Sequence, residues 1–246
     1  MVDLGQGYPF GLAGRRWALP VLLAVAVFVD LLIYDHRYSV LATAQSPATL
    51  AVFNFITRWG ESDWILIPSA LLLALSAGAF FFMRSSPSRP AFLELVWLFG
   101  FIFVGVGLPS LVSNLTKRII GRGRPDVFAQ FGTLSFHPFA GNFDFESFPS
   151  GHTTTAFAAA MVLGFLAPRW FWVGLVYAIA VAASRLVLGA HYPTDVFGGA
   201  LLGSLGAYWV RNFFARRGWG FERLPAGDVM RLPMPAMRRA LRLGRA

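Results

Sequence analysis

The sequence predicts an all-α, polytopic membrane protein with six transmembrane helices. Hydrophobic residues make up 56% of its 246 residues and charged residues only 13%, whereas soluble domains carry about 25% charged residues. The mean hydropathy is +0.58, and six apolar segments approach the roughly 20 residues that a helix needs to cross a bilayer. Cysteine is absent, which excludes disulfide bonds and thiolate metal sites.

The six predicted helices follow one another along the first 210 residues. They cover residues 17–33, 64–83, 91–112, 152–167, 170–188 and 195–210. The fourth and sixth segments reach the required length only when their polar ends are included, so we expect those ends at the membrane surface. In the sixth segment, Gly199 and Gly203 form a GxxxG pattern, which lets a neighbouring helix backbone approach closely.

The net charge of +9 lies mainly between the apolar segments and after residue 210. This distribution favours the charge asymmetry of a membrane protein over a nucleic-acid-binding surface. If the N-terminus is cytoplasmic, fourteen of the 21 Lys and Arg residues lie on the cytoplasmic side and seven on the other. The positive-inside rule therefore predicts cytoplasmic termini. We expect a six-helix membrane domain over residues 1–214 and a basic cytoplasmic tail over 215–246 that lies on the anionic inner leaflet.

The first polar motif, residues 117–125, follows the third apolar segment on the outer side. It holds four cations in eight residues, with no carboxylate among them. Lys117 and Arg124 are seven residues apart, so both point the same way if the helix persists, and two glycines and Pro125 then stop it. The cations repel one another unless an anion joins them. For Arg118 and Arg122 we expect anchoring at the membrane surface.

The second motif, residues 149–152, stands directly before the fourth predicted helix. Ser150 is a candidate N-cap, and the backbone amides that follow it point out of the positive end of the helix. Such an end binds anions, and Gly151 lets the backbone come close to one. His152 is placed to donate a proton to an oxygen that leaves the bound anion.

The third motif, residues 184–195, joins the fifth and sixth predicted helices. Arg185 ends the fifth helix, and Asp195 falls in the first turn of the sixth. Asp195 is four residues from His191, so we expect it to accept a hydrogen bond from one ring nitrogen. Such a bond fixes the tautomer and leaves the other nitrogen as a nucleophile. Under the predicted topology, all three motifs lie at the outer helix ends.

The three motifs read K-x6-R-P, P-S-G-H and S-R-x5-H-x3-D. Cations, a helix end, a nucleophilic histidine and an acid are the parts needed for phosphoryl transfer. Over residues 117–195 the chain closely resembles the type 2 phosphatidic-acid phosphatases, a family of integral membrane lipid phosphatases. The resemblance implies that His191 forms a phosphohistidine, that Asp195 orients it and that His152 protonates the leaving oxygen. It implies a phosphate site formed by Lys117, Arg124, Arg185, Ser150 and Gly151.

The resemblance implies a phosphatase that needs neither metal nor other cofactor and acts on a membrane lipid. The expected substrates are undecaprenyl pyrophosphate, lipid A phosphate, phosphatidic acid or phosphatidylglycerophosphate. The expected location is the bacterial inner membrane, with the site facing the periplasm and the phenylalanine-rich loop 126–149 covering the lipid headgroup. Two alternatives stay open: a phosphotransferase that passes the same phosphoryl group to another lipid, and a lipid-binding protein without catalytic activity.

Overall fold

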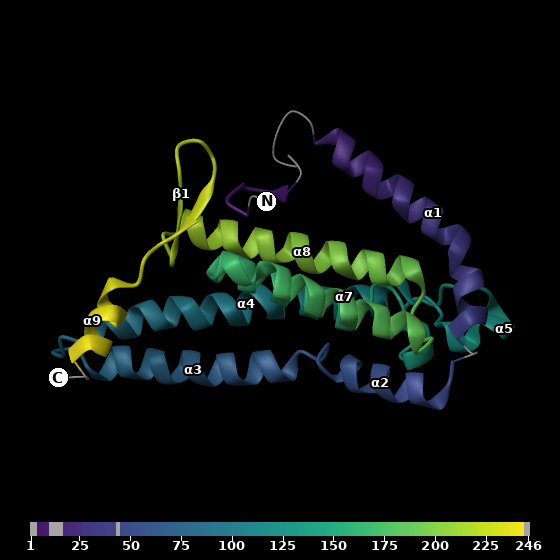
Figure 1. Cartoon of the computed structure of the whole chain (residues 1–246), viewed down its shortest axis with the longest axis horizontal. Helices are drawn as coiled ribbons and strands as arrows, with labels where there is room; N and C mark the ends of the chain where they lie inside the picture. The colour runs from purple at the N-terminus through teal and green to yellow at the C-terminus, as the bar shows by residue number, and fades with distance from the viewer. Residues whose placement is uncertain (1–3, 10–16, 43–44, 244–246) are drawn as a thin grey trace.

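The computed structural model describes residues 4–9, 17–42 and 45–243, and it is mainly helical. Most of the long helices lie roughly along one axis (Figure 1). The α-helices are α1 (Ala18–Ala42), α2 (Pro47–Arg58), α3 (Asp63–Phe82), α4 (Arg89–Ile120), α5 (Phe128–Phe131), α6 (Gly151–Leu166), α7 (Phe171–Val187), α8 (Pro193–Arg216) and α9 (Pro235–Leu243). Short 3-10 turns cover Pro125–Val127, Phe143–Phe145 and Pro168–Trp170.

The centre of the bundle is α6, which packs against α4, α7 and α8. Its side chains are small, and ten of its residues are buried. The predicted close approach at the GxxxG pattern is confirmed. A Cβ added to Gly199 would lie 2.6 Å from the Ser150 carbonyl oxygen, and one added to Gly203 would lie 2.3 Å from that of Thr154. Glycine at both positions therefore sets the spacing between α8 and α6.

Four candidate membrane spans lie within the described residues. They are Ala18–Asp35, Pro47–Phe82, Arg89–Ile120 and Pro168–Val187. The helix α6 is apolar but only 16 residues long, and α8 is not among the four candidates. The predicted count of six spans is not confirmed and stays a prediction.

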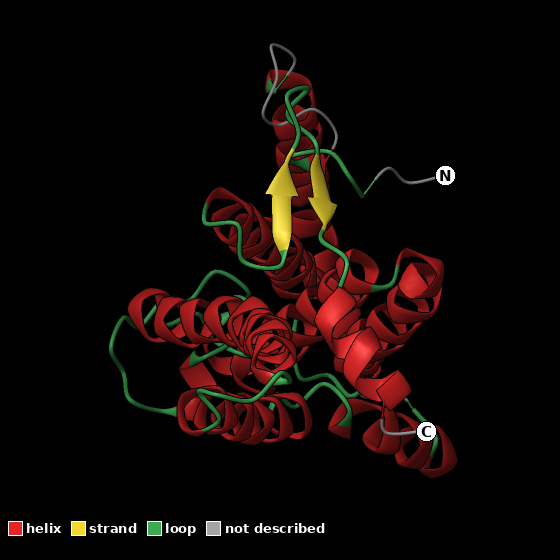
Figure 2. Ribbon diagram, turned by 90° about the vertical axis from the view of Figure 1, so that its left-hand side faces the viewer, coloured by secondary structure: helices red, strands yellow, loops and turns green. Residues whose placement is uncertain are grey.

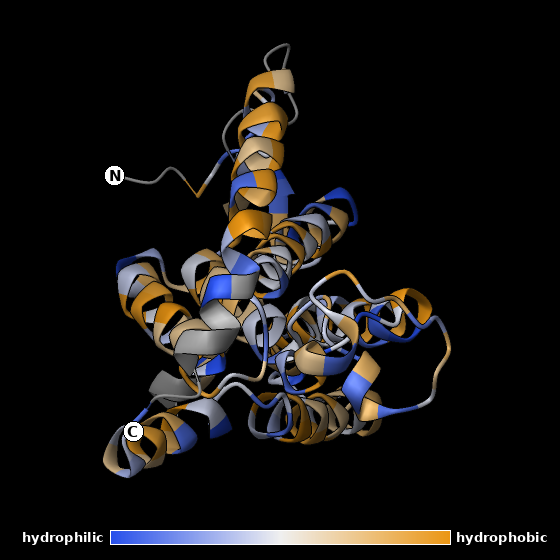
Figure 3. Cartoon of the chain, turned by 90° about the vertical axis from the view of Figure 1, so that its right-hand side faces the viewer, coloured by the Kyte–Doolittle hydropathy of each residue, from blue (hydrophilic) through white to orange (hydrophobic). Residues whose placement is uncertain are grey.

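The first helix is the least enclosed part of the bundle. Only 6% of its apolar stretch is buried, and Figure 3 shows it as a largely hydrophobic helix that projects from the other helices. It contacts α8 and α7, and Phe28 meets Phe148 edge-to-face with ring centroids 6.0 Å apart. Among the side chains of α1 that the structure describes, one polar side chain is fully buried, that of Asp35.

The chain after α8 folds back onto the bundle. Two short strands, β1 (Phe221–Arg223) and β2 (Val229–Arg231), pair antiparallel with Phe221 opposite Arg231 and stand at the edge of the helices in Figure 2. Phe221 and Val229 join the hydrophobic core. The all-α prediction is therefore correct for the bundle and misses this hairpin, whose three-residue strands are too short for a clear alternating pattern.

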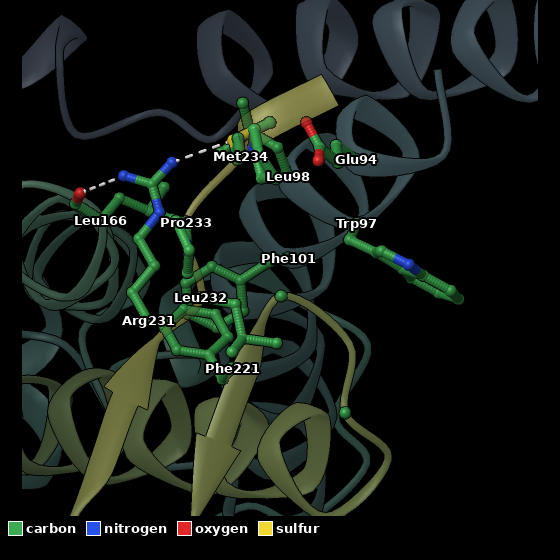
Figure 4. A pocket seen from close by; sticks show the side chains of 13 residues that line it. Glu94, Trp97, Leu98, Phe101, Leu166, Phe221, Arg231, Leu232, Pro233 and Met234 are labelled. Atoms are coloured by element: carbon green, nitrogen blue, oxygen red, sulfur yellow. Dashed lines mark hydrogen bonds between the residues drawn. The ribbon is translucent and has the colours of Figure 1, made fainter. Parts of the chain in front are cut away.

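The last helix is also docked to the bundle. The carboxylate of Glu94 accepts hydrogen bonds from the backbone N–H groups of Ala236 (3.0 Å) and Met237 (2.8 Å) at the start of α9. A carboxylate at a helix N-terminus accepts hydrogen bonds from the free amides and interacts favourably with the positive end of the helix dipole. Arg231 donates to the carbonyl of Leu166, and an apolar pocket opens between these segments (Figure 4). The division at residues 214 and 215 stays a prediction, since residues on both sides of it share one core.

The two ends of the bundle carry different segments of the chain. Residues 4–9 lie at the C-terminal end of α8, where Arg211 donates to the carbonyls of Leu4 and Gln6. The hairpin and α9 lie at the same end (Figure 1). The opposite end carries the end of α4, the start of α8 and the long loop between α4 and α6. The motif-bearing helix ends thus lie at the end of the bundle opposite residues 4–9, the hairpin and α9.

Candidate active site

The first motif begins on the last turn of α4. Lys117 is buried there, with 8% of its surface exposed. The helix ends at Ile120 because Gly121 adopts a left-handed φ of 62° and returns its N–H to the Lys117 carbonyl at 2.8 Å. A Cβ at Gly121 would lie 2.0 Å from the His137 carbonyl oxygen. The helix therefore stops at the first of the two glycines and does not persist to Arg124, so the two cations do not share one helix face.

Arg124 lies in the loop that follows, held by backbone carbonyl groups. Its side chain donates to Phe143 (2.9 Å), Ala190 (3.1 Å) and Glu146 (3.2 Å). Its own N–H donates to the carbonyl of Asp144 at 2.8 Å. The guanidinium also lies 3.7 Å from the centre of the Phe143 ring. These contacts tie loop 126–149 to the turn before α8 and fix the position of Arg124.

The second motif forms the start of α6. Ser150 is the N-cap residue as predicted, but its hydroxyl makes no capping bond and instead accepts one from Thr153 Oγ1 at 3.1 Å. The Ser150 N–H donates to the carbonyl of Asp195 at 2.9 Å. A Cβ at Gly151 would lie 3.0 Å from Lys117 Nζ. The ammonium of Lys117 is therefore placed against the amide end of α6, where both would attract the same anion.

His152 lies in the first turn of α6, packed between two other segments. A Cβ at Gly60, in the connection from α2 to α3, would lie 2.9 Å from two carbon atoms of His152 and 2.6 Å from Val181 on α7. The backbone at Gly60 therefore lies so close to His152 that no side chain fits between them. This close approach limits the directions in which His152 can turn.

Arg185 lies on the last turn of α7, with 8% of its surface exposed. Its Nη1 donates to Thr57 Oγ1 at 2.5 Å. Its Nε is buried and has no hydrogen-bond partner among the described residues. A buried donor without a partner costs free energy, so Nε of Arg185 is available to a ligand that brings an acceptor.

The carboxylate of Asp195 is held in the first turn of α8. One oxygen, Oδ1, accepts from Arg122 Nη1 at 2.6 Å. The other, Oδ2, accepts from Ser147 Oγ at 2.5 Å and from the Tyr192 N–H at 2.9 Å. The His191 Nδ1 atom lies 3.7 Å from Oδ2. This distance is longer than a hydrogen bond, so the predicted bond between His191 and Asp195 is absent here, although the two side chains are neighbours.

His191 is almost fully buried, with 3% of its surface exposed. Its Nδ1 has no hydrogen-bond partner among the described residues. Burial lowers the pKa of His191 to about 4; Asp195 acts in the opposite direction, and the charges of Arg124 and Arg185 lower the pKa further. The imidazole is therefore neutral near pH 7, the state in which a ring nitrogen can act as a nucleophile.

The three motifs meet at one end of the bundle. A Cβ at Gly151 in the second motif would lie 3.0 Å from Lys117 Nζ in the first. Arg124 donates to the carbonyl of Ala190, the residue before His191, and the Ser150 N–H donates to the carbonyl of Asp195. Residues 117 and 191, which are 74 positions apart in the sequence, thus lie at the same end of the bundle. Several buried cations face two histidines, and a bound anion would relieve their mutual repulsion.

Arg122 does not anchor the chain at the membrane surface as we expected. It is buried, with 2% of its surface exposed, and forms ion pairs with Asp35 (2.7 Å) and Asp195 (2.6 Å). Burial lowers its pKa, but the two carboxylates more than offset this effect and raise the pKa above its ordinary value. Arg118 does have an exposed side chain and lies 3.7 Å from Glu146.

Several contacting residues were not identified from the sequence. Asp35, Thr57 and Ser147 lie in segments that carry no motif. One signal was available for Asp35, since a carboxylate at the end of an apolar segment is costly unless it has a partner. The identity of the partner depends on the fold. No group of three or more His, Asp or Glu residues that could hold a metal ion occurs in the part of the chain that the structure describes.

Comparison with known proteins agrees with the motifs. The model of the PAP2 superfamily matches residues 94–219. A lipid A 1-phosphatase of Rhizobium johnstonii is 33% identical over 219 residues, which cover 88% of each chain. The phosphatidylglycerophosphatase B of Bacillus subtilis is 28% identical over 180 residues, covering 69% of this chain and 77% of that one.

A solved structure is also similar. It is the crystal structure of a transmembrane PAP2-type phosphatidylglycerolphosphate phosphatase from Bacillus subtilis, with a TM-score of 0.49 and 27% identity over 79% of this chain and 96% of that chain. The family match spans half of the chain and all three motifs, and the Rhizobium relative covers most of its length. The protein therefore belongs to the PAP2 superfamily and is a membrane-bound phosphatase of that family.

Proposed function

We propose that this protein is a lipid phosphatase that hydrolyses a lipid phosphate or pyrophosphate through a phosphohistidine on His191. The observation that carries the proposal is the meeting of a neutral, buried His191 with His152 and three buried cations at one end of the bundle. A phosphate bound there would neutralise the cations and lie beside both histidines. Positioning and charge stabilisation are the main sources of catalysis in phosphoryl transfer.

In the first step, Nε2 of His191 attacks phosphorus, because Nδ1 is the nitrogen that faces Asp195. The bound phosphate offsets the charges of the three cations, and His152 takes up a proton beside it. The bond from phosphorus to the lipid oxygen breaks, and His152 gives this proton to that oxygen. In the second step, His152 takes a proton from water, the hydroxide attacks phosphorus and the phosphorus–nitrogen bond breaks. Inorganic phosphate leaves and His191 is restored.

The phosphate site of the proposal combines three side-chain cations with the start of α6. Lys117 lies against Gly151, and Arg185 keeps a buried Nε donor without a partner among the described residues. Arg124 is fixed by three carbonyl groups. Ser150 and Gly151 supply backbone amides at the positive end of a helix. No step of the proposal uses a metal ion.

The substrate that we propose to test first is a lipid A 1-phosphate. The similarity to the Rhizobium lipid A 1-phosphatase extends over 88% of the chain, well beyond the three motifs. Undecaprenyl pyrophosphate, phosphatidic acid and phosphatidylglycerophosphate share the same reacting group and are the comparison substrates. In loop 126–149, Phe131, Phe136, Phe139 and Phe143 are exposed, which suits a loop that meets the apolar part of a lipid.

We place the site at the periplasmic face of the inner membrane, with both termini in the cytoplasm. The count of Lys and Arg on the two sides favours this orientation. The position of residues 4–9 and of α9 at the end opposite the motifs is compatible with it. The bound partners are then the bilayer and a lipid of its outer leaflet.

The test is phosphate release by the purified protein in detergent from each of the four lipids. We expect release from at least one of them, with the largest kcat/KM for lipid A 1-phosphate, and none from the His191→Gln variant. Transfer of the phosphoryl group to a second lipid without release of phosphate would identify a phosphotransferase instead. Binding without turnover of any of the lipids would contradict an enzymatic function.

A further inference from the structure

Arg122 joins the first helix to the catalytic end of the bundle. Its Nη1 donates to Asp195 Oδ1 and its Nη2 donates to Asp35 Oδ2, at 2.6 and 2.7 Å. The side chains of all three residues are at most 3% exposed. Thr194 completes the cluster, because Arg122 Nη1 donates to its Oγ1 at 2.6 Å and that hydroxyl donates to Asp35 at 2.6 Å. One cation is thus shared between two buried carboxylates from helices at opposite ends of the sequence.

The guanidinium is fixed on all sides. Its Nε and Nη2 also donate to the carbonyl of Thr133 at 3.3 and 3.2 Å, and its carbon lies 4.7 Å from the centre of the Tyr192 ring. The Thr194 N–H adds a further bond to Asp35 at 3.2 Å. A planar group with this many partners holds its acceptors in defined directions.

We propose that Arg122 and Asp35 are positioning residues that orient the Asp195 carboxylate toward His191, with Asp35 on α1 holding Arg122 in place. This inference rests on the proposed function, in which His191 is the nucleophile. The argument is geometric. Arg122 holds Oδ1 of Asp195, and Oδ2 is thereby left on the side of His191, Ser147 and the Tyr192 N–H.

The charge balance of the cluster predicts how the activities of the single and double variants should differ. Loss of Arg122 alone leaves two buried carboxylates without their shared cation, which is more costly than loss of the whole ion-pair group. Loss of both the Arg122 cation and the Asp35 charge leaves Asp195 with its bonds from Ser147 and Tyr192. The double variant Asp35→Asn/Arg122→Gln should therefore be more active than Arg122→Gln alone.

The experiment measures kcat and KM for phosphate release by Asp35→Asn, Arg122→Gln, Arg122→Lys and the double variant. Hydrogen-bond partners that orient the ligands of a metal ion typically contribute about 10- to 100-fold, and we expect the same scale for residues that orient Asp195. We expect a loss of kcat in that range for Arg122→Gln with KM within threefold of the wild type, a smaller loss for Asp35→Asn, and partial recovery in Arg122→Lys. The matched controls are Arg118→Gln and Asp30→Asn, whose side chains are exposed and which should keep wild-type rates.

A second measurement separates positioning from simple support of the fold. In an Asp195→Asn background, Arg122→Gln should cause no further loss of kcat, because its effect passes through the carboxylate that has been removed. The same fractional loss in both backgrounds would overturn the proposal, as would single variants that match the two controls. Asp35→Asn replaces one side chain by another of the same shape, so it tests the cluster with little change in packing.

The outcome is distinguishable from failure of the proposed function. If the wild-type protein releases no phosphate from any lipid, the proposed function itself fails. If the wild type and the controls are active and both Asp35→Asn and Arg122→Gln keep the wild-type rate, only the role of the cluster is overturned. The order of rates expected is wild type, Asp35→Asn, double variant and Arg122→Gln.

Discussion

Nδ1 of His191 and Oδ2 of Asp195 lie 3.7 Å apart, while the same oxygen accepts hydrogen bonds from Ser147 and the Tyr192 N–H. The carboxylate is thus already occupied, and the imidazole approaches it without bonding to it. Catalytic hydrogen bonds are often long in the absence of substrate and shorten in the complex. A positive charge that develops on His191 during attack on phosphorus would strengthen this contact. Under the proposed mechanism, we therefore expect the contact to shorten when His191 is phosphorylated.

The two histidines should differ in the step that they affect. His191→Gln should abolish both phosphate release and the acid-labile phosphoenzyme, because no nucleophile remains. His152→Gln should slow formation of the phosphoenzyme by about 10²- to 10⁴-fold, as expected for loss of a general acid, and less for substrates with an acidic leaving group. Rapid-quench measurement of labelled enzyme separates these outcomes. His137→Gln, at an exposed histidine outside the motifs, is the control, and equal effects of the two active-site variants would contradict the assigned roles.

The protonation of His191 can be measured directly, since the chain has four histidines. Burial lowers its pKa to about 4, below the ordinary value of about 6.5. The folded protein should therefore leave His191 neutral down to about pH 5, and the stability gained from burying the neutral ring should be full above pH 6.5 and fall as the pH drops toward 4. Nitrogen-15 NMR of labelled histidine, assigned by loss of one signal in His191→Gln, gives this value. A midpoint of 6 or higher would contradict it.

The contact between Lys117 and the start of α6 can be tested with a single methyl group. In Gly151→Ala, the new Cβ would lie 3.0 Å from Lys117 Nζ, so the flexible ammonium must move away from the helix end. We expect KM to rise about tenfold, which corresponds to about 1.4 kcal/mol, with an unchanged melting temperature. Gly78→Ala on α3 is the matched control, because nothing lies within 4 Å of its added Cβ. An unchanged KM in Gly151→Ala would separate Lys117 and Gly151 from the phosphate site.

Metal chelation should leave the reaction unchanged. The proposed site neutralises the phosphate with Lys117, Arg124 and Arg185 and uses His191 as the nucleophile, so no step requires a divalent ion. We expect the same rate of phosphate release before and after dialysis against EDTA, measured in detergent with a lipid whose solubility does not depend on metal. A rate that falls after dialysis and returns with Mg²⁺ would show that the site assignment is incomplete.

The orientation in the membrane can be tested with introduced cysteines, because the chain has none of its own. Leu134 in the loop before α6 is 66% exposed, and Ser85 is exposed in the connection between α3 and α4. With the site facing the periplasm, Leu134→Cys should react with an impermeant thiol reagent in intact spheroplasts, and Ser85→Cys only after lysis. The reverse pattern would place the reaction at the cytoplasmic leaflet. Both variants should retain phosphate release, which serves as the folding control.

The sequence alone determined the chemistry-bearing motifs, most of the helices and the family. These features depend on local patterns: the length of an apolar segment, the spacing of His191 and Asp195 within one turn, and the glycines at positions 199 and 203. The family prediction was confirmed because three motifs with fixed spacings rarely occur together by chance. The number of membrane crossings was less accessible, since α6 is apolar but only 16 residues long and α8 is not among the candidate spans.

The tertiary structure decided which polar side chains pair. Arg122 and Asp35 are 87 residues apart, and a residue pattern read along the chain contains no information about such a partner. Without one, an arginine at the end of an apolar helix is best explained by the membrane surface, and the expectation for Arg122 was wrong for that reason. The fold also placed Glu94 at the start of α9. The pairing of Arg122 depends on burial, because a buried charge must find a partner, and only the packed chain determines which one is within reach.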